Sequence, residues 1–191
     1  MNHHPTPHGE PSVHSRHLHV FIAILLAVLI AANMVLIYFF SAESGEESGN
    51  RSEGVTDMVI DITCPDYDKL PPAEQESLLA RVHHLVRKTA HFLEYALLGF
   101  LTACLLLHLR RRLIPRIRLW QTRVGPVGFC LAYAASDEIH QIFSNRGPRV
   151  TDVIIDTAGA VCGMAFLHVC VWLFGRIRAA MKHRKEGKEA L

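Results

Sequence analysis

The sequence lacks the local signatures that assign a chain to a class of enzyme. Neither HExxH nor GxSxG is present, and no segment repeats another. The cysteines carry little information, because four of the five lie within long apolar blocks and Cys64 stands alone in a polar stretch. Cysteine in apolar surroundings usually behaves as a small apolar residue. We therefore predict no disulfide, no zinc site built on thiolates and no cofactor.

The sequence also lacks a large net charge. It has 20 lysine and arginine residues and 18 aspartate and glutamate residues, so its formal net charge is +2. Blocks of arginine can indicate nucleic-acid binding, but beside an apolar span they more often mark the membrane leaflet that carries anionic lipids. We therefore expect no nucleic-acid partner. The distribution of charge is more informative than its total, because membrane topology follows the lysines and arginines of short loops.

Apolar residues are abundant, and they form four blocks. A helix needs about 20 mostly apolar residues to cross the core of a bilayer, and the blocks at 20–40, 91–109, 124–143 and 152–174 match this length. We predict an all-α polytopic membrane protein with four transmembrane helices. The first block is too long for the core of a cleaved signal peptide, and Arg16 is the only lysine or arginine before it, so we interpret it as an uncleaved anchor.

The basic residues predict the orientation of these helices. Six arginines lie between the second and third blocks, and six lysines and arginines follow the fourth. Both segments should be cytoplasmic, which puts both termini inside and the acidic loop at 41–90 outside. The predicted organisation is a disordered cytoplasmic tail at 1–19, a four-helix membrane domain at 20–175 and a basic cytoplasmic tail at 176–191.

The outer loop has two parts with different patterns. Residues 41–54 are rich in glycine, serine and glutamate, which predicts a flexible segment. After Pro72, apolar residues recur at helical spacing between Leu78 and Val86. They predict either an interfacial helix on the outer surface of the membrane or the first turns of the second transmembrane helix.

Ionisable residues gather at one end of the last three blocks. On a helix, Lys88, His91 and Tyr95 share one face at the start of the second block. Asp137 and Gln141 share a face at the end of the third block, and Asp152 and Asp156 share one at the start of the fourth. The predicted orientation brings all three sets to the outer end of the bundle, where one pocket can collect them. The candidate pocket residues are Lys88, His91, Glu94, Tyr95, Asp137, Glu138, His140, Gln141, Arg149, Asp152 and Asp156.

Ionisable groups at membrane depth are costly and usually mark a binding site or a pathway. The alternative is an interhelical hydrogen-bond network that only holds the bundle together. For Gly159 and Gly163 we favour close helix packing, because glycine lets two backbones approach. Lys88, Arg149 and the start of the last helix would suit a phosphate or carboxylate on a lipid headgroup, unless Arg149 pairs internally with a carboxylate.

These residues resemble the VanZ-like family of bacterial integral membrane proteins over most of the chain, from the first block to Gly163. The parts that carry the resemblance are the stretch 40–45, then Lys88, His91 and Tyr95, then Glu138 and Gln141, and finally Arg149, Asp152, Gly159 and Gly163. The resemblance implies an envelope protein of the bacterial cytoplasmic membrane, whose namesake is associated with lowered sensitivity to the glycopeptide teicoplanin. It does not imply a known reaction.

Three functions are consistent with these features. We favour a protein that binds or modulates membrane lipids, a lipid-linked wall precursor or a lipophilic glycopeptide antibiotic at the outer leaflet. One alternative is an intramembrane hydrolase or transferase acting on a lipid headgroup, with His91 or Glu138 as general base. Its metal-assisted version would use a metal held by His91, Glu138, His140 and Asp152. The other alternative is an assembly or scaffolding subunit, and the sequence leaves the oligomeric state open.

Overall fold

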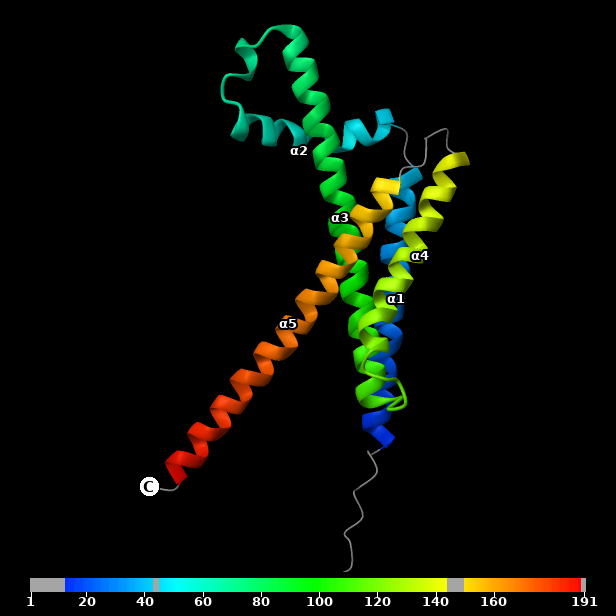
Figure 1. Ribbon diagram of the computed structural model, residues 1–191, viewed down its shortest axis with the longest axis vertical. Coiled ribbons are helices and arrows are strands. Elements are labelled where there is room, and N and C mark those ends of the chain that lie inside the picture. Colours follow the sequence, from blue (N-terminus) through cyan, green and yellow to red (C-terminus); the bar gives the residue numbers. More distant parts are fainter. Residues whose placement is uncertain (1–12, 43–44, 144–149, 190–191) are drawn as a thin grey trace, which may run out of the picture.

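Five α-helices make up most of the described residues in a computed structural model of the protein (Figure 1). They are α1 (Val13–Ala42), α2 (Gly45–Thr63), α3 (Pro72–Arg112), α4 (Gln121–Phe143) and α5 (Val150–Glu189), with a short 3-10 helix η1 (Tyr67–Lys69) before α3. The structure describes residues 13–42, 45–143 and 150–189, and it describes side chains over 14–41, 53–140 and 150–182. Those residues contain no strand, which confirms the predicted all-α class.

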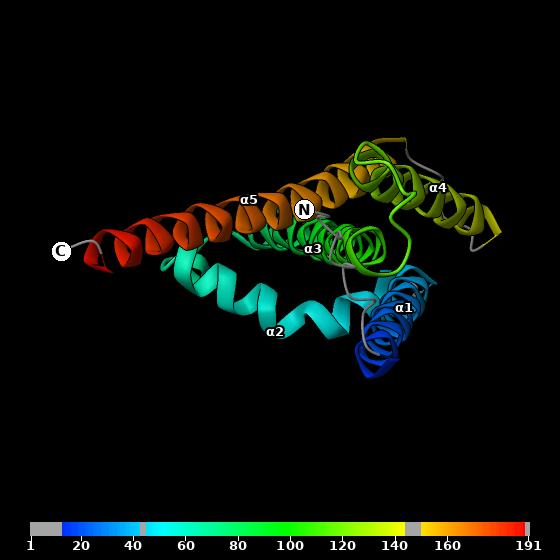
Figure 2. The same ribbon diagram turned by 90° about the horizontal axis from the view of Figure 1, so that it is seen from below.

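The helix α3 lies at the centre of the bundle and contacts each of the other four helices. Figure 2 shows α3 nearly end-on, with α1 and α5 on different sides of it. In Figure 1, α1 and α4 run beside the lower part of α3, whereas α5 crosses α3 and then diverges towards its carboxyl end. The ends of α1 and α4 and the start of α5 therefore meet beside the middle of α3.

Within the described part of the chain, three helices are long and apolar enough to cross a membrane: α1, α3 and α5. The helix α4 covers the third predicted span, but it is not among these three. Its apolar stretch ends at Ala135 and is followed by Ser136, Asp137 and Glu138. The apolar part of α4 is therefore shorter than a bilayer core requires, and only three of the four predicted spans are supported by length and composition.

The side chains of the long helices have the distribution expected in contact with lipid. Large apolar side chains such as Phe21, Phe39 and Phe166 are more than half exposed, whereas the polar side chains of Asn33 and Asp156 are buried. Soluble monomers rarely leave large continuous apolar surfaces exposed to water. The exposed apolar surface and the three candidate spans together identify a membrane protein.

The prediction of a flexible segment at 41–54 is wrong, because α2 begins at Gly45. The second half of α2 packs against the amino-terminal part of α3, with Thr56 and Ile60 buried and Thr56 Oγ1 3.5 Å from His83 Nδ1. Helices in proteins gain most of their stability from tertiary packing of one face rather than from intrinsic propensity. Burial against α3 thus outweighs the glycine- and serine-rich composition of the first half of α2.

The helix α3 is continuous over 41 residues, so the residues between Leu78 and Val86 belong to the same helix as the second span and do not form a separate interfacial helix. Pro72 lies in the first turn, where its missing N–H breaks no helical hydrogen bond. At 1.5 Å per residue α3 is about 60 Å long, roughly twice the thickness of a bilayer core. Its polar amino-terminal part, which contacts α2, therefore extends beyond the apolar layer.

The crossing of α3 and α5 is so close that glycine is required at three positions. A Cβ atom added to Gly99 of α3 would lie 2.7 Å from the Cα atom of Ala160 and would also collide with its carbonyl oxygen. On α5, a Cβ atom at Gly159 or Gly163 would collide with the backbone of α3. Backbone atoms held in a helix do not move aside easily, so these glycines set the distance between the two helices.

Candidate functional site

Five carboxylates gather where the ends of α1 and α4 and the start of α5 meet α3. We call them the acidic cluster, and its members are Glu94 of α3, Asp137 and Glu138 of α4, and Asp152 and Asp156 of α5. Asp137, Glu138 and Asp156 are buried. Asp137, Glu138 and Asp152 lie close enough to Asp156 for electrostatic interaction with its carboxyl group. Asp137 also lies close enough to interact with Glu94. The three predicted sets of ionisable residues therefore come together in space.

An ion pair between Lys88 of α3 and Asp152 of α5 lies at the edge of the acidic cluster. Only 19% of the Lys88 side chain and 25% of the Asp152 side chain are exposed. Asp152 Oδ1 also accepts a hydrogen bond from Thr151 Oγ1 at 3.2 Å. Desolvation offsets much of the attraction in such a pair, so its main effect is to hold the start of α5 in register with α3.

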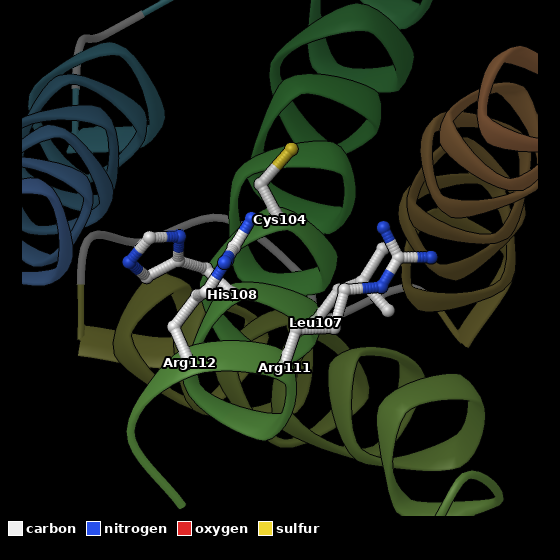
Figure 3. Close-up of a pocket in the computed structure, with 5 residues that line it drawn as sticks. All are labelled: Cys104, Leu107, His108, Arg111 and Arg112. Atoms are coloured by element: carbon white, nitrogen blue, oxygen red, sulfur yellow. The ribbon is translucent and has the colours of Figure 1, made fainter. Parts of the chain in front are cut away.

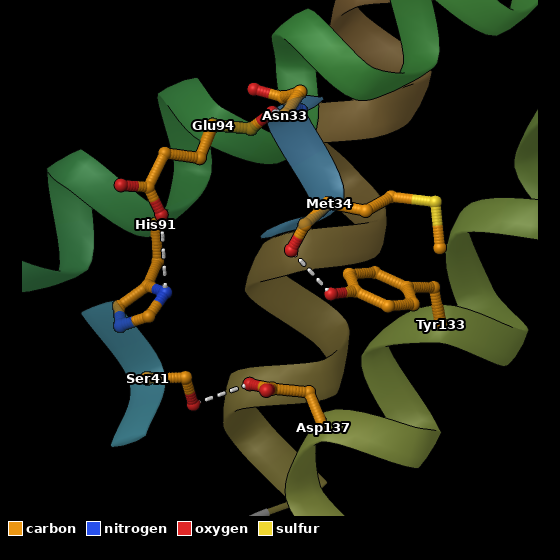
Figure 4. A network of polar contacts seen from close by, with 7 residues as sticks. All are labelled: Asn33, Met34, Ser41, His91, Glu94, Tyr133 and Asp137. Atoms are coloured by element: carbon orange, nitrogen blue, oxygen red, sulfur yellow. Dashed lines mark hydrogen bonds and ion pairs between the residues drawn. The ribbon is translucent and has the colours of Figure 1, made fainter. Parts of the chain in front are cut away.

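His91 and Glu94 lie on successive turns of α3 and face each other (Figure 4). His91 Nδ1 lies 3.6 Å from Glu94 Oε2, which is longer than a hydrogen bond. These two buried atoms and the hydroxyl of Tyr95 have no hydrogen-bond partner among the residues that the structure describes. Buried polar atoms are normally hydrogen-bonded. These three atoms are therefore unsatisfied hydrogen-bonding groups beside the acidic cluster.

Asp137 connects α4 to the end of α1. Ser41 Oγ donates a hydrogen bond of 2.7 Å to Asp137 Oδ2, and both residues are buried (Figure 4). One turn further along α4, the ring of His140 packs against the ring of Tyr38 with 4.8 Å between their centroids. His140 thus belongs to the contact between α1 and α4, beside the acidic cluster.

Two further hydrogen bonds join α1 to α3 and to α4, nearer the middle of α1 than Ser41. Asn33 Nδ2 donates to the carbonyl oxygen of Glu94 at 3.2 Å, and the hydroxyl of Tyr133 donates to the carbonyl oxygen of Met34 at 2.6 Å (Figure 4). The sequence predictions do not include these residues. Asn33 is the only strongly polar side chain in the first apolar block, and Tyr133 lies one turn before Asp137, so both had a recognisable signal.

Replacing Tyr133 with phenylalanine is expected to lower the free energy of unfolding by about 1 kcal/mol, because the Met34 carbonyl loses its donor. The measurement is the midpoint of unfolding by sodium dodecyl sulfate in mixed micelles, followed by circular dichroism. Tyr38→Phe is the matched control, since the described residues offer the Tyr38 hydroxyl no hydrogen-bond partner. Equal midpoints for the two variants would contradict the bond between α4 and α1.

The described residues do not form the metal site of the metal-assisted alternative, which stays a prediction. Among the described residues, no group of three or more histidine, cysteine, aspartate and glutamate side chains could hold a metal ion. His140 is packed against Tyr38, and Asp152 is paired with Lys88, so these two do not join His91.

Two candidate residues lie outside what the structure describes. They are Arg149 and the side chain of Gln141. A phosphate or carboxylate site built on Arg149 therefore stays a prediction. Gly159 and Gly163, by contrast, lie against the α3 backbone one and two turns below Asp156. The acidic cluster offers mainly hydrogen-bond acceptors, because its members are carboxylates. Lys88, the lysine at its edge, is already paired with Asp152.

Comparison with known proteins identifies the family. The family model described as VanZ/LLP1 matches residues 22–173, which run from α1 through most of α5 and include the whole acidic cluster. This match confirms the resemblance seen in the sequence. Comparison with curated proteins and with solved structures finds no match.

Proposed function

Because the chain belongs to the VanZ/LLP1 family, we propose that it is a binding protein of the bacterial cell envelope. Its ligand is the headgroup of a membrane lipid, a lipid-linked wall precursor or a lipophilic glycopeptide antibiotic at the outer leaflet of the cytoplasmic membrane. The observation that carries this proposal is the acidic cluster with its three unsatisfied polar atoms. Burying charge at membrane depth is costly, and holding helices together does not require five carboxylates.

The proposal includes four transmembrane helices with both termini in the cytoplasm. Four helices, α1, α3, α4 and α5, alternate in direction (Figure 1), so the arginine-rich segment 110–123 lies at the opposite end from α2. Lysine and arginine near the ends of spans favour the cytoplasmic side. The acidic cluster, which lies towards the α2 end, would then face the outer leaflet, with α4 as the third span.

The chemistry of the acidic cluster favours a headgroup with amino or hydroxyl groups. Carboxylates only accept hydrogen bonds when ionised, and charge-assisted bonds to them are the strong ones. Glu94 Oε2, His91 Nδ1 and the Tyr95 hydroxyl provide further buried polar atoms within the same region. Sugars and amines of a wall precursor or a glycopeptide supply the matching donors.

The test is binding to purified protein in lipid nanodiscs, with teicoplanin and a lipid-linked wall precursor as the two probes. Glu138→Gln and Asp156→Asn keep the shape of each side chain but remove its charge, and each is expected to weaken binding about tenfold, as loss of one charge-assisted hydrogen bond does. Asp66→Asn is the control, because Asp66 is an exposed carboxylate paired with Lys69 outside the acidic cluster.

Unchanged affinity in folded Glu138→Gln and Asp156→Asn proteins would overturn the binding proposal. Variants that lose their fold or leave the membrane would instead support the scaffolding alternative. Folding is checked by circular dichroism, so that the two outcomes are distinguished.

The enzyme alternative has one specific observation in its favour. His91 and Glu94 have the arrangement of a base and the carboxylate that orients it, although their 3.6 Å separation is loose. The same nanodisc preparation therefore also serves for a turnover assay with the lipid-linked precursor. A product formed by the wild-type protein and lost in His91→Gln, while the precursor still binds, would replace the binding proposal by a hydrolase or transferase.

A further inference from the structure

A pocket lies at the arginine end of α3, away from the acidic cluster (Figure 3). Its volume is about 280 Å³, and its lining residues are Cys104, Leu107, His108, Arg111 and Arg112. These residues form one stripe on α3, since they are spaced three and four apart. In Figure 3, α1 and α5 flank this stripe on opposite sides. Leu107 lies 16 residues, or about 24 Å, further along α3 than His91, so the two sites are distinct.

One wall of this pocket is fixed by a contact between α3 and α1. His108 Nε2 donates a hydrogen bond of 3.1 Å to the carbonyl oxygen of His19, and the two rings meet edge to face with 5.4 Å between their centroids. The position of the His108 ring is therefore set by the fold. The pocket is preformed on this side.

The mouth of the pocket is basic and its floor is apolar. Arg111 and Arg112 are exposed, whereas Leu107 is buried and Cys104 is half-buried. The sequence has no aspartate or glutamate between Glu94 and Asp137, so neither this part of α3 nor the following connection supplies a counter-charge. Among the described residues, neither arginine forms an ion pair. In Figure 3 the Arg112 guanidinium lies beside His108 and the Arg111 guanidinium lies beside Leu107, so the two groups flank an apolar surface.

We infer that this pocket binds the phosphate group of an anionic membrane lipid. Arginine forms paired hydrogen bonds with phosphate oxygens, and Arg111 and Arg112 lie at the mouth. The first carbons of an acyl chain would lie over Cys104 and then along the half-exposed side chain of Leu97, which continues the same stripe. Exposed Trp120, directly before α4, places this region at the interface where tryptophan is enriched.

An apolar floor favours a lipid over free phosphate, because inorganic phosphate gains nothing from contact with Leu107 and Cys104. The inference goes beyond the proposed function, since it needs no ligand in the acidic cluster. It also differs from general attraction of basic residues to anionic lipids, because it assigns the binding to two of the six arginines in the segment 110–123. That difference determines the experiment.

The experiment measures phosphatidylglycerol retained by the detergent-purified protein, by native mass spectrometry, with phosphatidylcholine as the neutral comparison. Arg111→Gln/Arg112→Gln is expected to weaken phosphatidylglycerol binding at least about tenfold. Arg116→Gln/Arg118→Gln removes the same charge outside the pocket and should change binding less than about twofold. Cys104→Phe fills the pocket without changing any charge, and it is also expected to abolish the preference for phosphatidylglycerol.

Equal losses in the two arginine pairs would overturn the pocket and leave only diffuse attraction. Absence of any preference for phosphatidylglycerol in the wild-type protein would overturn it as well. Displacement of the lipid by excess inorganic phosphate would overturn the lipid as the source of the phosphate group. Because all these variants leave the acidic cluster unchanged, none of these results bears on the proposed function.

Discussion

Replacing Gly163 with alanine is expected to destabilise the protein by about 3 kcal/mol, at the upper end of the range for overpacked cores. The added Cβ atom would fall on the carbonyl oxygen of Ala96, which the helical hydrogen bonds of α3 hold in place. The two helices would have to separate along their whole crossing, including the contact at Gly159. The measurement is the unfolding midpoint in sodium dodecyl sulfate, followed by circular dichroism in mixed micelles.

Gly175→Ala is the matched control on the same helix, because an added Cβ atom there meets nothing within 4 Å. Alanine forms helix better than glycine by about 1 kcal/mol, so this variant should be slightly more stable than the wild-type protein. The two substitutions add the same methyl group and are expected to act in opposite directions. If Gly163→Ala unfolds at the wild-type midpoint, the close crossing of α3 and α5 is wrong.

Replacing Lys88 with methionine is expected to cost about 2 kcal/mol, because it leaves Asp152 largely buried without its counter-charge. A fully buried pair would cost about 3 to 5 kcal/mol, but the 25% exposure of Asp152 lets water reduce the loss. Adding Asp152→Leu removes the isolated charge, so the double variant should recover most of the stability. The unfolding midpoint of the single and double variants measures this recovery.

Lys69→Met is the control for this pair. Lys69 and Asp66 form an ion pair with side chains 80% and 73% exposed, so its loss should cost less than about 0.5 kcal/mol. Equal instability of the single and double Lys88 variants would contradict the pairing of Lys88 with Asp152. Precursor binding by the folded double variant then distinguishes two roles: retained binding makes the pair structural, and lost binding makes it part of the ligand site.

The positions of the long helices could be predicted because apolar blocks of membrane-spanning length are visible in one sequence. Their bounds could not, because hydropathy marks only the part of a helix that suits lipid. The helix α3 begins at Pro72, well before its apolar block at residue 91, and α5 continues to Glu189. Helical hydrogen bonding continues through polar residues, so a helix does not end where its apolar block ends.

The end of the bundle at which the candidate site lies could be predicted from the sequence. The contacts that its residues make with other helices could not. Spacing along each helix and the arginine distribution were enough to bring Asp137 and Asp156 to the same end of the bundle. The bond between Ser41 and Asp137 joins residues 96 positions apart, and it depends on how α1 and α4 rotate against each other. Hydrophobic pattern alone does not define that rotation, and a serine at the end of a span looks like an ordinary polar boundary.

The helix α3 is unbroken, so it rigidly joins regions of the protein that a loop would have left independent. The helix carries the α2 contact near Val82, the acidic cluster at His91, the crossing at Gly99 and the basic pocket at Arg111. Helices that lack an internal proline bend only gently, and α3 has none after its first turn. The α2 contact, the acidic cluster and the basic pocket therefore keep a fixed spacing along one helix. If occupancy of one site changes the affinity of the other, linkage requires the reverse effect to have the same factor.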